Sequence, residues 1–312
     1  MTDLAATLSG MSEEDLDRFF HESDAELIVK LAGDTSDREM EQLLLDESVR
    51  AAAVGSVLAR LDEYAVEERL AAVKGTVAFR LRLPKRGEES YALEFLDSGV
   101  TVVPPGGACD VTITCRMLDF LRLVTGGVNA ALLYLGARLS IEGDEMLALD
   151  VGGVFRVPGS DGVAVDPRQL DPADVAVAIA KVKDSHLHAV MTGGLRDVVL
   201  TEVFRRLPGY VHAEKAHRHR LAIAFKIGGR PDGESDRFLV TLREGCAVVE
   251  RVEGDDEARD RDATIALSGA QFLKLVTGHL NPVKGVMRGH LKVRGDVKAA
   301  LTFSGLMDIP SA

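Results

Sequence analysis

The chain has 312 residues, of which 46% are hydrophobic and 28% are charged, a composition typical of a folded globular protein rather than a disordered one. Its length suits about two domains, and its net charge of -12 argues against nucleic-acid binding, which needs basic surface for phosphate contacts. Residues 1–166 carry 15 Lys and Arg against 30 Asp and Glu, whereas residues 167–312 carry 22 against 19. This asymmetry fits either ordinary solvated surfaces or an attraction between the halves or toward an anionic ligand.

The sequence predicts no membrane-inserted or exported segment. No stretch reaches the roughly 18 to 20 consecutive apolar residues of a membrane span, so we expect no stable membrane insertion. Residues 1–15 lack the basic start and apolar run of a secretory signal. Cys109, Cys115 and Cys246 form no CxxC pair, which disfavours a disulfide framework or a zinc site. A reducing cytoplasm fits these features.

The first 70 residues predict helices. Ser12, followed three residues later by Asp15, resembles a capping box, and Leu16 and Phe20 begin an apolar helical face. Further helix is expected through Leu61. This part of the chain therefore supplies a helical layer before any strand begins.

From residue 77 the apolar pattern changes to period two, which predicts a sheet with one buried face. Residues 77–81 alternate in this way, and more strands are expected near 91–96, 99–103 and 111–115. A short helix follows, because Met117, Phe120, Leu121 and Val124 have i, i+3, i+4, i+7 spacing. The last strand is expected over 138–142, before a terminal apolar segment.

The same order of elements occurs twice. LVTGGVN at 123–129 is nearly repeated as LVTGHLN at 275–281, and the two copies end in the chain's only asparagines, Asn129 and Asn281. Such self-similarity indicates a repeat. Its long period excludes a solenoid and indicates a duplicated domain.

The repeat extends well beyond this motif. At a shift of 146, VAFRL at 77–81 lies on IAFKI at 223–227. At a shift of 152, LSIEGD at 139–144 lies on LKVRGD at 291–296, after a six-residue insertion in the second copy around GDDEARD. Whole domains therefore correspond.

The domain boundary is expected in a stretch rich in Pro, Gly and Asp. We expect a first domain over 1–157, a linker over 158–170 and a second domain over 171–312. Asp171 and Pro172 open the first helix of the second domain, because proline is tolerated at the first helical position.

The repeated motif itself reads as a joint between two helices. Gly126 or Gly278 can adopt the left-handed conformation that ends a helix. Asn129 or Asn281 can then cap the start of the next. Its role is expected to be geometric rather than chemical.

At these residues the chain resembles the sterol carrier protein type 2 domain, a lipid-binding module. Residues 262–301, DATIALSGAQFLKLVTGHLNPVKGVMRGHLKVRGDVKAAL, carry a strand, a Phe-Leu helix, a TG-x-x-N-P joint and a final L-K-[VI]-x-G-D strand. Residues 110–149 match less well, because they lack the proline after Asn129 and have Ser140 where the second copy has Lys292. The resemblance covers both copies and is strongest over the last 50 residues of each.

The resemblance implies an α+β fold with two tandem copies of a mostly antiparallel five-stranded sheet covered by helices, each preceded by N-terminal helices. It also implies an apolar tunnel for a fatty acid, acyl-CoA, sterol or phospholipid. The leading interpretation is non-enzymatic binding and intracellular carriage of such a ligand, with the better-preserved site in the second domain.

The tunnel walls are expected to come from the two short helices and the last strand of each copy. Apolar residues at these positions also fit an ordinary core. The expected ligand-binding residues are Phe272, Leu275, Val276, Leu280, Val283, Val286, Met287, Leu291 and Val293 in the second copy, and Phe120, Val124, Val128, Leu132, Leu135, Leu139 and Ile141 in the first.

No motif for catalysis or cofactor binding is apparent. GxxxxGK[ST], GxGxxG in a strand-to-helix context, GxSxG and HExxH are all missing, so no catalytic residue, cofactor or metal is assigned. The histidines and Glu214 of segment 212–220 suit zinc or nickel, and Lys215, Arg218 and Arg220 suit a phosphate or CoA head group. This segment precedes a strand, where charged residues usually face solvent.

Two other functions stay open. One is a scaffold or accessory subunit that docks a lipid-modifying enzyme through the acidic first copy. The other is a cofactor-free cyclase or isomerase that uses the apolar cavity and buried polar groups, to which no motif points. Separately, His21 and Asp24 on a presumed helix are a candidate acid/base pair. The expected partners are an apolar small molecule and a lipid-metabolising enzyme, with no nucleic acid.

Overall fold

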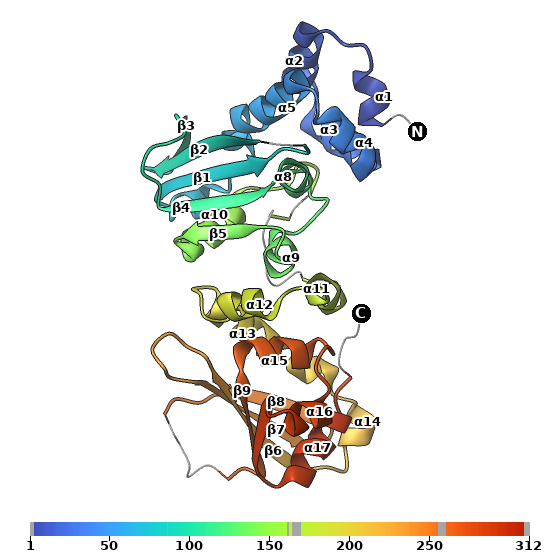
Figure 1. The fold of residues 1–312 in the computed structure, drawn as a ribbon, viewed down its shortest axis with the longest axis vertical. Coiled ribbons are helices and arrows are strands. Elements are labelled where there is room, and N and C mark those ends of the chain that lie inside the picture. The colour runs from blue at the N-terminus through green and yellow to red at the C-terminus, as the bar shows by residue number, and fades with distance from the viewer. Residues whose placement is uncertain (1–2, 86, 161, 164–169, 255–259, 309–312) are drawn as a thin grey trace. The chain divides into compact units, whose positions relative to one another are not determined.

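The computed structural model describes residues 3–85, 87–160, 162–163, 170–254 and 260–308 (Figure 1). The chain divides into two compact units, Met1–Leu170 and Asp171–Ala312. Most of the expected linker, residues 161 and 164–169, lies outside the described residues, as does the centre of the expected insertion, residues 255–259.

The first unit begins with helices. They are α1 (Leu4–Leu8), α2 (Glu13–Glu22), α3 (Ala25–Asp34), α4 (Asp37–Leu43), α5 (Glu47–Ala59), α6 (Leu61–Tyr64) and α7 (Glu67–Leu70). The predicted start of α2 is confirmed, because the Ser12 side chain accepts a hydrogen bond from the Asp15 backbone and Leu16 and Phe20 are buried. The apolar face of α2 packs against α5.

A five-stranded sheet follows these helices. Its strands are β1 (Gly75–Arg82), β2 (Glu88–Leu96), β3 (Gly99–Val103), β4 (Val111–Arg116) and β5 (Ser140–Gly143), in the order β3-β2-β1-β4-β5. The pairing of β1 with β4 is parallel, and the other pairings are antiparallel. Between β4 and β5 lie α8 (Met117–Val124) and α9 (Ala130–Leu135), and α10 (Glu145–Val154) follows β5.

The second unit repeats this plan. Its helices are α11 (Pro172–Ile179), α12 (Asp184–Val190), α13 (Arg196–Arg206), the 3-10 helix η2 (Leu207–Tyr210), α14 (Ala213–Ala216), α15 (Gly269–Val276), α16 (Pro282–Met287) and α17 (Val297–Gly305). The strands are β6 (Leu221–Gly228), β7 (Asp236–Arg243), β8 (Cys246–Arg251), β9 (Ala263–Ser268) and β10 (Leu291–Gly295), in the order β10-β9-β6-β7-β8. The predicted fold class, two mostly antiparallel five-stranded sheets with helices, is confirmed.

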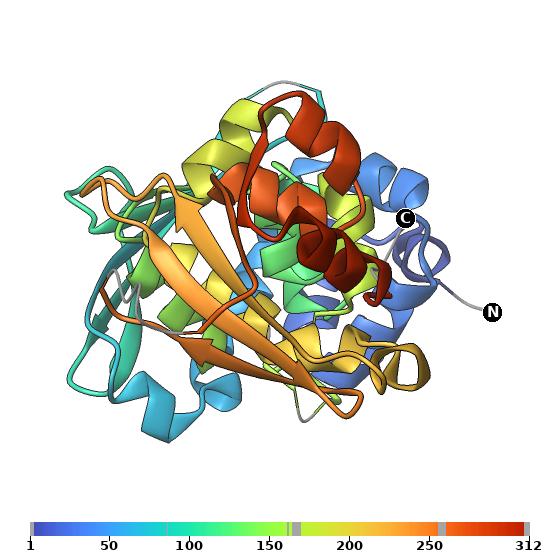
Figure 2. The ribbon, with the colours of Figure 1, turned by 90° about the horizontal axis from the view of Figure 1, so that it is seen from below.

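Each sheet buries one face beneath helices. In β6, Ile223, Phe225 and Ile227 are buried, and the parallel register places Phe225 beside Ile265 of β9. Helices α15 and α17 pack on these strands, and Figure 2 shows the orange strands of this sheet running alongside one another. The period-two pattern of the sequence therefore identified the core face correctly.

Aromatic rings fill the middle of the second unit. Phe204 of α13 stacks on Phe238 with ring centroids 3.8 Å apart and on Phe272 at 5.1 Å. Phe225 meets Phe272 at 6.2 Å and Phe303 of α17 at 6.0 Å. These five rings join α13, α15 and α17 to the sheet, and large aromatic areas of this kind contribute strongly to a core.

The repeated LVTG motif is a helix joint, as predicted. Gly126 and Gly278 have φ of 72° and 76°, the left-handed conformation that ends a helix. Asn129 then accepts a hydrogen bond from the Ala131 backbone at 2.8 Å, and Asn281 accepts one from Lys284 at 3.1 Å. Both asparagines therefore cap the following helix.

The Gly-Asp pair at the end of β5 and β10 turns the chain into the last helix. Gly295 has φ of 85°, and a Cβ there would lie 2.5 Å from the Asp262 carbonyl oxygen. The Asp296 backbone donates to that same oxygen at 2.8 Å, and its side chain caps α17. Gly143 and Asp144 repeat this arrangement in the first unit, so the close approach explains why glycine stands there twice.

Gly295→Ala is expected to lower the free energy of unfolding by about 3 kcal/mol, because it adds a clash with backbone to the strain of a positive φ. Gly289→Ala is the matched control: Gly289 has φ of 75° but nothing within 4 Å of its Cβ position, so a loss of about 1 kcal/mol is expected. Urea unfolding measures both, and equal losses would contradict the close approach.

Cys115 is expected to be unreactive in the folded chain. It is buried on β4, and burial raises the pKa of its thiol to about 12, whereas Cys109 and Cys246 are exposed. The thiolate is the reactive form, so Ellman's reagent at mildly alkaline pH should modify two thiols in the folded protein and three in denaturant. A Cys109→Ser/Cys246→Ser variant that still reacts when folded would refute this placement.

Candidate functional site

The predicted ligand-binding residues of the second unit fall into two groups. Phe272, Leu275, Leu280 and Leu291 are buried, and Val276 and Val293 are half-buried. The pairing of Leu291 with Leu267 and of Val293 with Ile265 places both on the helix-covered face of the sheet. These six residues lie in the layer between β9, β10 and the helices.

The other three, Val283, Val286 and Met287, lie at the surface. Their exposed fractions are 52%, 41% and 83%. The cause is Gly285, which turns the opposite side of α16 toward the sheet; a Cβ there would lie 2.4 Å from Leu291 Cδ1. The apolar spacing on α16 therefore does not mark an inward face.

The predicted residues of the first unit are all buried or half-buried. Phe120, Leu135 and Leu139 are buried. Phe120 contacts Phe79 with ring centroids 5.7 Å apart. The half-buried members are Val124, Val128, Leu132 and Ile141.

The two layers are filled differently. Phe204 and Phe303 correspond in the repeat to Leu58 and Val151 of the first unit. Phe238 lies opposite Phe225 as the half-buried Tyr91 lies opposite Phe79, so this strand position is aromatic in both units. In the second unit the stacked rings occupy the β6 and β7 side of the layer. Two of these three positions therefore carry a phenylalanine only in the second unit.

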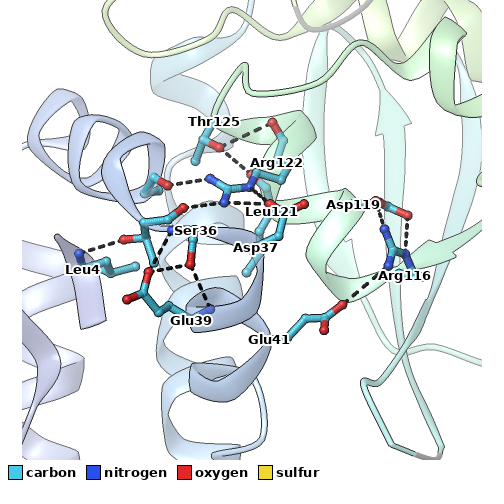
Figure 3. A network of polar contacts seen from close by, with 12 residues as sticks. Leu4, Ser36, Asp37, Glu39, Glu41, Arg116, Asp119, Leu121, Arg122 and Thr125 are labelled. Atoms are coloured by element: carbon cyan, nitrogen blue, oxygen red, sulfur yellow. Dashed lines mark hydrogen bonds and ion pairs between the residues drawn. The ribbon is translucent and has the colours of Figure 1, made fainter. Parts of the chain in front are cut away.

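In the first unit, Arg122 of α8 ties the preceding helices to the layer (Figure 3). Its guanidinium donates to the carbonyl of Ala32 at 2.5 Å and of Thr35 at 2.6 Å, and it pairs with Asp37 at 2.9 Å. Lys274 stands at the same repeat position in α15 and pairs with Asp184 of α12. The same repeat position thus carries a cation that bonds to the preceding helices in both units.

A second repeated cation lies on the helix before each sheet. Arg50 is buried and its Nε donates to Glu89 of β2 at 2.8 Å. Arg196 is buried and its Nε donates to Asp236 of β7 at 2.7 Å, while its Nη2 donates to the Ile227 carbonyl at 2.8 Å. Glu89 and Asp236 are equivalent, because each lies opposite the same repeat position of the first strand, Leu81 or Ile227. Sequence reasoning did not identify these anchors, because no local pattern marks a contact between residues some 40 positions apart.

Buried carboxylates in the described residues are held by arginines. Asp119, which is fully buried, accepts two hydrogen bonds of 2.9 Å from Arg116 (Figure 3). It accepts a further one from Arg138. Asp236 pairs with Arg251 at 2.9 Å in addition to Arg196. Every buried side-chain nitrogen and oxygen in the described part of the chain has a partner. Such bidentate pairs fix structure.

The candidate acid/base pair of His21 and Asp24 is not formed. His21 Nδ1 lies 3.0 Å from the Asp17 carbonyl oxygen and 3.2 Å from its carboxylate. Asp24 instead caps α3 by accepting a hydrogen bond from the Glu26 backbone. Both acidic residues have local helical roles, so the sequence-based hypothesis was wrong here.

The histidine-rich segment is at the surface. His217 is exposed, and His212 lies 4.0 Å from the Asp308 carboxylate. Across the described residues, no three His, Cys, Asp or Glu side chains gather as metal ligands would. Lys215, Arg218 and Arg220 are exposed, as expected for a segment that precedes a strand.

Two further observations concern surfaces away from the layer. An open depression of about 590 Å³ lies beside α1 and α2, lined by residues such as Met11, Arg18 and Phe19, and includes none of the predicted ligand-binding residues. Within the described ranges, no helix combines the length and apolarity required to cross a bilayer.

The chain matches known proteins over these same layers. The SCP-2 sterol transfer family matches residues 56–156 and 203–308. Hydroxysteroid dehydrogenase-like protein 2 of Xenopus tropicalis is 22% identical, over 75% of this chain and 54% of its own length. Sterol carrier protein 2 of Homo sapiens is 31% identical over 27% of this chain and 14% of its own length. The chain thus spans about half the length of the first of these relatives and much less of the second.

Among solved structures, the apo form of sterol carrier protein 2 from Yarrowia lipolytica covers 41% of this chain and 91% of its own, at 24% identity and a TM-score of 0.26. The family match accounts for more than half of the chain and falls once on each sheet with its covering helices. The chain therefore belongs to the SCP-2 sterol transfer family and carries the family's domain twice.

Proposed function

We propose that this chain binds and carries an apolar lipid, a fatty acid, acyl-CoA, sterol or phospholipid, in the layer between sheet and helices. The observation that carries the proposal is the family match over both layers, together with the one-sided apolar face of each sheet. Burial supplies the affinity: each methylene removed from water contributes about 0.8 kcal/mol, or on the order of 12 kcal/mol for a 16-carbon chain. Immobilisation offsets roughly half of that, which leaves about 6 kcal/mol, or a Kd of some tens of micromolar.

In the second unit we place the ligand on the β9 and β10 side. Val276 and Val293 are half-buried there, so they combine apolar surface with access. Stacked rings fill part of the β6 and β7 side, which supports this placement. Val283, Val286 and Met287 face outward, so they would meet a ligand on its way in rather than enclose it.

The proposed carriage is non-enzymatic. Asp119 is held by two arginines and Asp236 by three, which supports a structural role for both carboxylates. We propose that the second unit holds the better site, because its helix joint keeps the proline of the family pattern, Pro282, directly after the capping asparagine.

Val293→Trp is expected to weaken fatty-acid binding by at least tenfold in the second unit, because the bulky ring fills the space that an acyl chain would take. The chain has no tryptophan, so the introduced indole is also a fluorescence reporter. Palmitate is titrated into the full-length variant. Tryptophan emission reports whether the ligand reaches position 293, and calorimetry gives the affinity and the number of ligands bound.

The matched control is Lys292→Trp, one residue away and on the opposite face of β10. It should leave the affinity within about twofold, with emission that does not respond to palmitate. Ile141→Trp and Ser140→Trp are the equivalent pair in β5 and report on the first unit. Failure of the wild-type chain to bind palmitate, acyl-CoA, sterol or phospholipid would refute the proposal, and unchanged binding in both Val293→Trp and Ile141→Trp would refute the placement.

A further inference from the structure

The outward side of α16 and α17 is apolar. Val283, Val286 and Met287 on α16 and Val297 and Leu301 on α17 are each at least 41% exposed. Both helices pack on the edge strand β10. We call these five residues the α16–α17 face. An exposed apolar patch on a folded protein indicates a contact surface.

The exposure follows from local packing rather than from an unfinished core. At about 100° per residue, positions 283, 286 and 287 share one side of a helix, and position 285 lies on the other. Gly285 is buried against Leu280 and Leu291. On α17, Ala299, Ala300 and Phe303 face the sheet, which leaves Val297 and Leu301 outward. The inward sides of both helices are already filled.

Cations flank this face. Lys284 and Arg288 follow the apolar positions around α16, and Lys298 lies beside Val297 on α17; all three are exposed. Within the described residues none of the three forms an ion pair. The one acidic side chain between α16 and α17, Asp296, is engaged in capping α17. An apolar centre with unpaired cations at its side is complementary to anionic head groups above acyl chains.

The first unit lacks this combination. By the shift of 152, Lys284, Arg288 and Lys298 correspond to Leu132, Gly136 and Met146, and Val297 corresponds to Glu145. The first unit also carries the chain's excess of acidic residues. The cations are therefore specific to one copy and are not required by the fold.

We propose that the α16–α17 face docks the second unit onto an anionic lipid bilayer. This inference rests on the proposed carriage of a lipid, because a carrier has to contact the membrane that supplies its ligand. The inference assigns that contact to one surface. Met287 enters the interface, Lys284 and Arg288 contact lipid phosphates, and the adjacent β9 and β10 side of the layer receives the ligand. Docking is peripheral and involves no spanning segment.

The test is vesicle flotation of the full chain with phosphatidylcholine vesicles that contain or lack phosphatidylglycerol. The chain should float with the anionic vesicles and not with pure phosphatidylcholine. Lys284→Ala/Arg288→Ala should lower partitioning about 25-fold, since each cation near an anionic surface contributes roughly fivefold. Val286→Ser/Met287→Ser should lower it about tenfold or more, because two apolar side chains no longer enter the interface.

Controls remove the same chemistry elsewhere in the second unit. Lys292→Ala/Arg294→Ala takes two exposed cations from the opposite face of β10, and Val248→Ser takes an apolar side chain from β8 that is 58% exposed. Both should float as the wild type does, within about twofold, because neither removes a residue of the α16–α17 face or one of the cations that flank it.

Three outcomes overturn the proposal. The chain does not float with anionic vesicles, or the control variants lose as much partitioning as the docking variants do. The third is a dimer that Val286→Ser/Met287→Ser dissociates, which would make the α16–α17 face a self-association surface. Palmitate titration of the same variants separates this result from the proposed function. Docking variants that still bind palmitate support the separate surface, whereas a wild type that floats but binds no lipid would overturn the carriage and keep the docking.

Discussion

Covering one apolar face of each sheet is the constraint on which the rest of the structure depends. Residues such as Ile223, Phe225 and Ile227 alternate along β6 and lie together on one side, where exposure to water would cost about 1.5 to 3 kcal/mol for each large side chain. Helices have to be held over that face, and repeated cations do so in both units: Arg50 and Arg196 fix the helix before the sheet. The candidate lipid layer is thus a consequence of how the fold buries its core.

The duplication shows which parts of this design vary. The turn after the last strand is the same in both units, because Gly143 and Gly295 both approach a backbone carbonyl too closely for any side chain. The residues that fill the core change, since the second unit has phenylalanine where the first has Leu58 and Val151. The two units therefore share one fold but differ in the side chains between sheet and helices. Such a difference would suit two different ligands, or one ligand and one partner.

The sequence predicted the fold in detail where local chemistry decides structure. Period-two alternation identified the strands, and the positive-φ glycines and capping asparagines of the LVTG joint were predicted by residue type alone. It could not predict tertiary ion pairs: Arg122 reaches carbonyls of Ala32 and Thr35 some 90 residues away, and no local pattern marks that contact. For the same reason the spacing of Val283, Val286 and Met287 suggested a buried stripe, whereas the close fit of Gly285 on Leu291 decides which side of α16 faces inward.

The central claim is that the layer holds a lipid, and native mass spectrometry of the gently purified full chain tests it most directly. The account predicts one or two lipid equivalents per chain, released and identified by organic extraction. An empty chain that also takes up neither fatty acid nor acyl-CoA when these are supplied would contradict it.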